Sequence, residues 1–146
     1  MLDVETETLI RCPRERVAAY AGDPTHAPVW YANIKAVEWV SPPPLNLGTR
    51  LAFVASFLGR RIACTYEVIE YRHGTRLVMR TSEGPFPMET TYEWHDDGEG
   101  TRMTLRNRGM PSGFSRLVTP FLSVAVRAAN RKDLGRLKRI LEADCR

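Results

Sequence analysis

The stretch METTYEWHDDGEGTRMTLRNR, residues 88–108, decides the fold class. On both sides of the turn-forming segment HDDGEG, apolar and polar side chains alternate with a period of two, which predicts β-strands with one buried face. The short polar segment between the two runs predicts an antiparallel hairpin. A sheet of this kind must cover its apolar face with another layer of structure.

The same alternation recurs along most of the chain, so the hairpin belongs to a larger sheet. Seven strands are predicted, near residues 4–10, 35–40, 49–57, 61–71, 75–82, 86–95 and 101–108. Two short helices are predicted after the first strand. Pro13 and Gly22 bound the first of them, and the second covers residues 25–33, where Trp30 and Tyr31 supply an apolar face.

The amphipathic segment 112–142 is the main helix available to cover the sheet. Ser112 is a candidate cap, and Pro120 predicts a restart or a kink, followed by one helix over 120–142. Its predicted inward face consists of Phe114, Leu117, Val118, Phe121, Ala125 and Ala128, followed by Leu134, Leu137, Ile140 and Leu141. We therefore predict an α+β fold, a single domain over 1–146. In it, a curved seven-stranded antiparallel sheet wraps around the long C-terminal helix.

Composition places the chain among ordinary globular proteins, because 43% of its 146 residues are hydrophobic and 26% are charged. Its longest apolar run, 51–58, is too short to span a bilayer, and its start lacks the pattern of a signal peptide. A cytoplasmic location is predicted. Cys12, Cys64 and Cys145 are odd in number and lack Cys-x-x-Cys spacing, so reduced thiols are expected rather than a disulfide framework or a zinc knuckle.

The net charge of +4 raises the question of nucleic-acid binding. The predicted outer face of the sheet carries Glu5, Glu7, Arg76, Arg80, Glu89, Glu93, Arg102, Arg106 and Arg108. These charges alternate in sign if the first strand pairs with the seventh, so we predict an ion-paired face and no nucleic-acid partner. The C-terminal helix carries further cations on its outer side: Arg127, Arg131, Lys132, Arg136, Lys138 and Arg139. For these cations we predict a solvated surface with at most transient membrane contact.

Motifs for metal or cofactor chemistry are missing from the sequence. His26, His73 and His95 fall in three separate predicted turns or loops, so no metal site is predicted. There is no Gly-x-Ser-x-Gly elbow, phosphate-binding loop or dinucleotide glycine motif, so no cofactor is predicted. Cys64 is interpreted as a small core residue rather than a nucleophile.

The residues predicted to face the interior include several that suit a ligand pocket. Aromatic and methionine side chains would form its walls, while hydroxyl and amide groups would orient a ligand. The predicted ligand-binding residues are Trp30, Tyr31, Phe53, Tyr66, Met79, Thr81, Met88, Thr90, Tyr92, Asn107, Phe121, Ala125 and Ala128. Besides Glu70, which points inward only if its strand stays regular, Tyr66 and Tyr92 are the candidates to give or take a proton.

Several short motifs, read in this order of elements, resemble the START/polyketide-cyclase superfamily, also called SRPBCC. They are Ile10-x-x-Pro13, Trp30-Tyr31, Gly48-Thr-Arg, Pro85-Phe-Pro-Met-Glu-Thr-Thr-Tyr-Glu-Trp94, Gly100-Thr-Arg-Met and Asp133-Leu-Gly-Arg-Leu-Lys138. The resemblance covers essentially the whole chain. It implies a helix-grip fold with an apolar cavity for lipids, sterols, polyketides or similar molecules. Plant members have a glycine-rich loop where this chain has Pro42-Pro-Pro-Leu-Asn-Leu-Gly48, so no phosphate cradle is expected there.

Three functions remain open at this point. The first is binding of a hydrophobic small molecule in a cavity between the sheet and the C-terminal helix. The second is a cyclase or dehydratase activity on a ligand held in that cavity, and the third is a protein-interaction module. The superfamily contains carriers and enzymes alike, so the fold alone does not choose between them.

Overall fold

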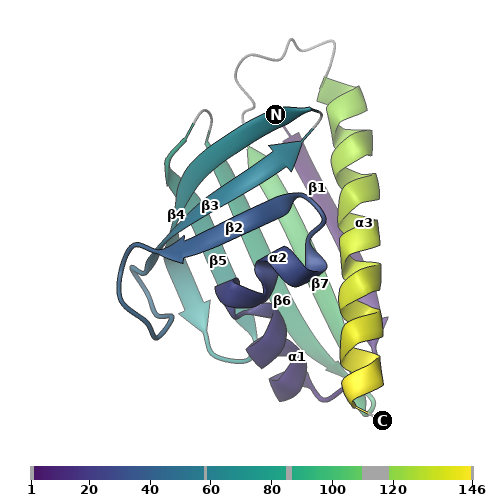
Figure 1. Cartoon of the computed structure of the whole chain (residues 1–146). Helices are drawn as coiled ribbons and strands as arrows, with labels where there is room; N and C mark the ends of the chain where they lie inside the picture. Colours follow the sequence, from purple (N-terminus) through teal and green to yellow (C-terminus); the bar gives the residue numbers. More distant parts are fainter. Residues whose placement is uncertain (1, 58, 85–86, 110–118, 146) are drawn as a thin grey trace.

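The computed structural model describes residues 2–57, 59–84, 87–109 and 119–145 (Figure 1). The predicted cap at Ser112 and the inward positions Phe114, Leu117 and Val118 lie outside the described residues. The elements are β1 Leu2–Ile10, α1 Arg14–Ala21, the 3₁₀ turn η1 Pro24–His26, α2 Ala27–Trp30, β2 Ile34–Trp39, β3 Arg50–Phe57, β4 Arg60–Arg72, β5 Arg76–Glu83, β6 Met88–Asp97, β7 Gly100–Gly109 and α3 Thr119–Asp144.

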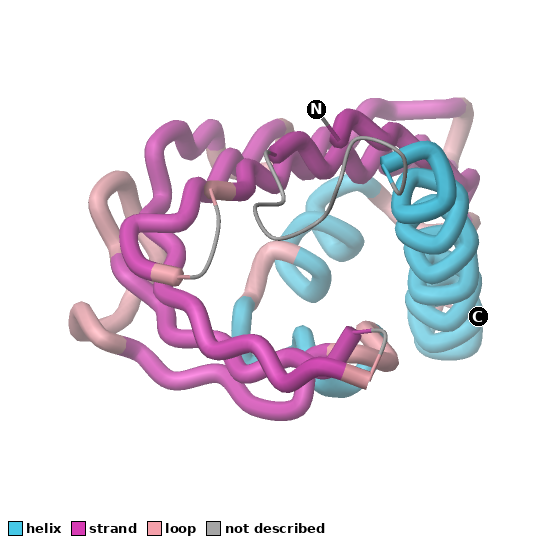
Figure 2. The backbone as a smooth tube through the Cα atoms, turned by 90° about the horizontal axis from the view of Figure 1, so that it is seen from above, coloured by secondary structure: helices cyan, strands magenta, loops and turns pink. Residues whose placement is uncertain are grey.

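The seven strands form one antiparallel sheet in the order β1-β7-β6-β5-β4-β3-β2. Each strand from β2 to β7 pairs with its neighbour in the chain, and β1 closes the order beside β7, which is the pairing on which the predicted ion-paired face depends. The sheet curls strongly, and α3 runs along its open side (Figure 2). The helices α1 and α2 lie over one end of the concave face (Figure 1). The predicted helix-grip fold is confirmed.

The register places the predicted faces of the strands as expected. Tyr92 on β6 lies opposite Leu77 on β5 and Leu105 on β7, and all three are buried. The outer face holds Glu89, whose carboxylate accepts a 3.0 Å hydrogen bond from Arg108. Since side chains alternate across a strand, the apolar and charged sets are separated by the sheet itself.

Strand β4 is not regular, and the irregularity decides where Glu70 lies. The pairing register of β4 with β5 shifts between Val68, which is paired with Met79, and Glu70, which is paired with Val78. A bulge of this kind shifts the alternation of side chains. Glu70 consequently lies with the outer charges, 2.9 Å from Arg76 Nε. It is not an inward acid.

Of the two short helices after β1, the first lies between Pro13 and Gly22 as predicted, and the second is shorter than expected. Helix α1 follows Pro13 and buries Val17, Ala18 and Ala21. The predicted second helix over 25–33 is only η1 followed by the single turn of α2. It ends at Trp30 because the next residue, Tyr31, is extended, with φ −86° and ψ 124°.

The C-terminal half of helix α3 buries Leu134, Leu137 and Leu141 as predicted, but its N-terminal half presents a different face from the predicted one. Its buried residues include Leu122, Asn130, Asp133, Leu134, Leu137 and Leu141. Phe121 is 74% exposed and Ala128 is also exposed, so the expectation that they face inward is wrong. Leu122 instead packs with Leu2 and Val4 of the edge strand β1. A shift of one residue rotates a helix face by about 100°, which moves Phe121 away from the sheet.

The structure also corrects the expectation of three reduced thiols. Cys12, just after β1, is disulfide-bonded to Cys145 at the end of α3, with Cα atoms 5.6 Å apart. Cys64 is free. The two bonded residues are separated by 133 positions in the sequence, so only the tertiary fold brings them together.

A candidate ligand pocket

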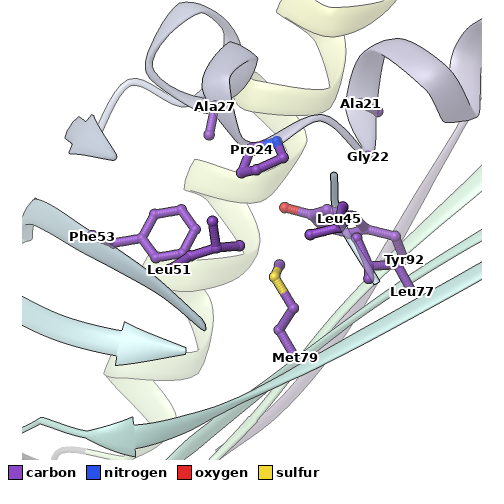
Figure 3. Close-up of a pocket in the computed structure, with 10 residues that line it drawn as sticks. All are labelled: Ala21, Gly22, Pro24, Ala27, Leu45, Leu51, Phe53, Leu77, Met79 and Tyr92. Carbon is purple, nitrogen blue, oxygen red and sulfur yellow. The ribbon is translucent and has the colours of Figure 1, made fainter. Parts of the chain in front are cut away.

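An apolar pocket lies between the sheet and the segment that contains α1 and α2 (Figure 3). Its lining residues are Ala21, Gly22, Pro24, Ala27, Leu45, Leu51, Phe53, Leu77, Met79 and Tyr92. Tyr92 supplies the single polar side-chain group among them, and no lining residue comes from α3. The open space is about 10 Å³, which is room for about one water molecule.

Small residues bring the helical segment close to the sheet at this pocket. A Cβ atom at Gly22 would lie 2.6 Å from the carbonyl oxygen of Ala18 and 3.4 Å from the ring of Trp94, so glycine is required there. Asp23 then turns the chain, since its carboxylate accepts hydrogen bonds from the backbone N–H of Thr25 at 3.0 Å and from its hydroxyl at 2.7 Å. This cap orients Pro24 into the pocket.

Tyr31 and Tyr92 form a buried hydroxyl pair beside the pocket, with their oxygens 2.6 Å apart. Trp30 stacks on Tyr31 with ring centroids 4.0 Å apart. Burial raises the pKa of both phenols, so both are neutral at physiological pH. Only one hydroxyl proton lies in the bond between them. The other hydroxyl keeps its proton available for a further acceptor.

Asp133 is a buried carboxyl group on α3 near this pair, with a side chain that is 3% exposed. It accepts a 3.1 Å hydrogen bond from the backbone N–H of Ala32, and Arg136 Nη1 lies 3.7 Å from the same oxygen. Arg136 also donates to the carbonyl oxygen of Trp30 at 3.1 Å. Desolvation by burial raises the pKa of Asp133, against the opposing effects of Ala32 and Arg136. These contacts attach α3 to the chain around Tyr31.

A second polar chain crosses the sheet through Tyr66, Thr90 and Asn107. Thr90 donates a 2.8 Å hydrogen bond to the amide oxygen of Asn107, and Tyr66 is hydrogen-bonded to Thr90. The contact with Thr90 acts to lower the pKa of Tyr66, against the larger effect of burial. Burial raises the pKa of Tyr66, and that of Cys64 to about 11. The Cys64 thiol is therefore protonated at neutral pH, as expected for a core residue.

The predicted site residues fall into separate groups. Phe53, Met79 and Tyr92 line the pocket, and Trp30 and Tyr31 adjoin Tyr92. Thr81 accepts a hydrogen bond from the backbone N–H of Met88, which ties these two residues to each other. The remaining predictions are placed as follows: Tyr66, Thr90 and Asn107 in the second polar chain, Ala125 half-buried, and Phe121 and Ala128 exposed.

Sequence reasoning missed Asp133 and the helical wall of the pocket. The sequence assigned no inward role to Asp133, although it lies three residues after Asn130 and four before Leu137, on their buried stripe. Ala21 and Ala27 have no polar or reactive side-chain group that would mark them in the sequence as site residues. Among the described residues, the Nε1 atoms of Trp30 and Trp94 and the amide nitrogen of Asn130 are buried without a hydrogen-bond partner.

Neither a metal cluster nor a membrane-spanning helix occurs among the described residues. They contain no group of three or more histidine, cysteine, aspartate or glutamate side chains arranged to hold a metal ion. None of the helices in this part of the chain combines the length and the apolar character needed to cross a membrane.

Comparison with known proteins agrees with this geometry. Residues 1–142 match the family described as polyketide cyclase / dehydrase and lipid transport, and the chain belongs to that family. No protein of the curated set matches the sequence.

Solved structures share the fold at low sequence identity. A protein from Thermus thermophilus is 24% identical, with a TM-score of 0.84 and 99% of each chain covered. The Zhui aromatase/cyclase from a Streptomyces species is 15% identical, with a TM-score of 0.82 and coverage of 99% of this chain and 95% of that one. A START superfamily protein from Mycobacterium smegmatis is 14% identical, with a TM-score of 0.71 and coverage of 98% and 96%. At these identities the likeness shows a shared fold.

Proposed function

We propose that this protein binds a hydrophobic small molecule, such as a lipid or a polyketide, inside the curled sheet. The observation that carries the proposal is the pocket of Figure 3, where nine of ten lining residues are apolar and Tyr92 adds one polar group. Binding sites for apolar ligands have this composition, with few polar groups that fix orientation. The family description, which includes lipid transport, supports the same class of ligand.

Binding of such a ligand requires side chains in the pocket to move, because the open space matches about one water molecule. Met79 is suited to this movement, since methionine is unbranched and adapts its shape to its neighbours. Leu45 is also suited, since it lies in the loop between β2 and β3 and is only half-buried. We expect these two side chains to make room for the ligand.

The test is uptake of the uncharged dye Nile red, followed by its fluorescence, with the protein variant Leu45→Trp. The larger ring fills the pocket from a loop, and dye affinity should fall by at least about tenfold. Leu47→Trp is the matched control, because Leu47 lies in the same loop, is 66% exposed and does not line the pocket. Equal dye binding by the parent and Leu45→Trp would refute the proposed pocket.

A second candidate function, a cyclase or dehydratase, is favoured by the Tyr31–Tyr92 pair. A neutral hydroxyl with a free proton donates to a ketone oxygen and stabilises the negative charge that develops on it. The Zhui aromatase/cyclase, which shares the fold, supports this chemistry. With both phenols neutral, the pair acts as a donor and not as a base.

This second function is tested by turnover of a ketone-bearing polyketide chain. Tyr92→Phe keeps the ring and removes the hydroxyl, so turnover should fall by roughly 10²–10³-fold, as for loss of one oxyanion donor. Tyr66→Phe is the control, and it should lower turnover less because Tyr66 neither lines the pocket nor belongs to the Tyr31–Tyr92 pair. Unchanged turnover in both Tyr31→Phe and Tyr92→Phe would refute the enzymatic proposal.

A further inference from the structure

Helix α3 exposes an unusual combination of side chains on the side away from its buried residues. We define the outer stripe as Phe121, Val124, Ala128, Arg131 and Lys132, all of which are exposed. Phe121 is 74% and Val124 is 68% exposed, which is high for large apolar side chains. The spacing of three and four residues places the five side chains on one face of the helix.

The cations of the outer stripe have no acidic partner in the described part of the chain. Neither Arg131 nor Lys132 takes part in an ion pair there. The acidic residues of α3 are all engaged elsewhere: Asp133 with Ala32 and Arg136, Glu142 with Arg11 and Lys138, and Asp144 with Arg16. The outer stripe is therefore an apolar patch next to uncompensated positive charge.

The charges select the kind of partner that fits this surface. In a two-fold dimer through the outer stripe, each copy would face the same cations on the other, and like charges in an interface are unfavourable. A nucleic acid would contact Phe121 and Val124 with its phosphates, which those side chains do not bind. An anionic lipid surface suits both the cations and the apolar side chains of the outer stripe. Its headgroups attract the cations, and its acyl boundary accepts the apolar side chains.

We propose that the outer stripe of α3 is a docking surface for membranes that contain anionic lipids. Phe121 and Val124 enter the headgroup region, while Arg131 and Lys132 pair with lipid phosphates. The contact is reversible and sensitive to salt, because it uses one short apolar patch and two exposed charges. This inference goes beyond the proposed ligand binding, and it is measured without a ligand, so either can fail alone.

The experiment is flotation of the full chain with vesicles of phosphatidylcholine containing phosphatidylglycerol, at low ionic strength. We expect co-flotation that decreases as salt rises toward physiological strength, where the Debye length is about 8 Å. Vesicles of phosphatidylcholine alone should bind far less. Arg131→Gln with Lys132→Gln should lower the partition coefficient by roughly 30-fold, since each cation near an anionic surface contributes about fivefold.

Two further variants separate a docking surface from simple attraction of a basic protein. Phe121→Ser with Val124→Ser should lower partition by about tenfold without loss of thermal stability, because both side chains are exposed. Arg61→Gln with Arg80→Gln removes two exposed charges from the sheet instead and should leave partition nearly unchanged. The proposal is overturned if anionic vesicles bind no protein, or if the Arg61 and Arg80 variant loses as much binding as the Arg131 and Lys132 variant. It is also overturned if the chain forms a dimer that Phe121→Ser abolishes.

Discussion

The two halves of α3 differ in how they are attached to the rest of the molecule. In the C-terminal half, Leu134, Leu137 and Leu141 are almost fully buried. In the N-terminal half, Leu122 is buried against β1, while Phe121 and Val124 face outward. One continuous helix thus serves as part of the core at one end and as a surface at the other.

Polar contacts reinforce this difference at the C-terminal end. Lys138 donates to the carbonyl oxygen of Leu9, and the backbone N–H of Arg11 donates to Glu142 at 2.8 Å. Arg16 pairs with Asp144 at 2.5 Å. All of these contacts join α3 to the segment where β1 leads into α1, the same place that the disulfide reaches. The C-terminal half of α3 is therefore the half that is fixed to the rest of the fold, and we call it the anchored half.

The largest expected effect is on the core of the anchored half. Leu137→Ala removes a side chain that is 0% exposed and leaves a cavity, so the free energy of unfolding should fall by about 2–5 kcal/mol. Val124→Ala, in the other half, should change it by no more than about 0.5 kcal/mol. Chemical denaturation of the two variants measures both values. Similar losses in the two would contradict the difference between the halves.

The second effect concerns the disulfide. Cys145→Ser removes a cross-link between residues 133 positions apart, which should cost about 2–4 kcal/mol of stability. Thermal unfolding with and without dithiothreitol provides the measurement: the reductant should lower the Tm of the parent but not that of the variant. Cys64→Ser is the control and should keep the response to reductant. If dithiothreitol did not change the Tm of the parent protein, the disulfide would not stabilise the anchored half of α3.

The third effect is the pH dependence of Asp133, which sits where α3 meets the chain after α2. Burial raises its folded pKa above the usual value of 3.8, so the folded protein binds more protons than the unfolded chain just above that pH. Stability from this group is full at lower pH and declines as the pH rises through the window above 3.8.

Asp133→Asn should remove this decline, because an amide oxygen still accepts from Ala32 but carries no charge. The stability of the variant relative to the parent should therefore rise with pH, by less than the effects of Leu137→Ala and Cys145→Ser. Denaturation series from about pH 4 to about pH 7 give this difference, in which the carboxyl groups common to both proteins cancel. A difference that does not vary with pH would refute the assignment of a raised pKa.

These contrasts also show what the sequence determines. The seven strands and their inner and outer faces follow from side-chain alternation, which is a local signal. The pairing of β1 with β7 was a condition of the predicted ion-paired face, and the structure shows that pairing. The rotation of α3 is not local. It depends on contact of Leu122 with Leu2 and Val4, which lie more than a hundred residues away in the chain.

The part of the candidate site that lies on the strands could be predicted from the same alternation of side chains. Phe53, Met79 and Tyr92 were found because strand periodicity turns them inward. Asp133 was missed because a charged residue on an amphipathic helix normally faces water. Its burial follows only from the packing of α3 near Tyr31. The pairing of Cys12 with Cys145 is likewise a property of the closed fold and not of their spacing.

The smallest effect tests the outer face of β1, whose inner face holds the N-terminal half of α3. Asp3 accepts two hydrogen bonds from Arg106, at 2.9 and 2.7 Å. Arg106 lowers the pKa of Asp3, so stability from this pair is present at neutral pH and is lost as the pH falls below the usual value of 3.8. Asp3→Asn should cost less than about 1 kcal/mol, because both side chains are partly exposed and water screens the pair. The cost should shrink further in high salt, and it is measured by denaturation at two salt concentrations. A loss as large as that of Leu137→Ala would mean that the edge strand, rather than the buried end of α3, anchors the helix.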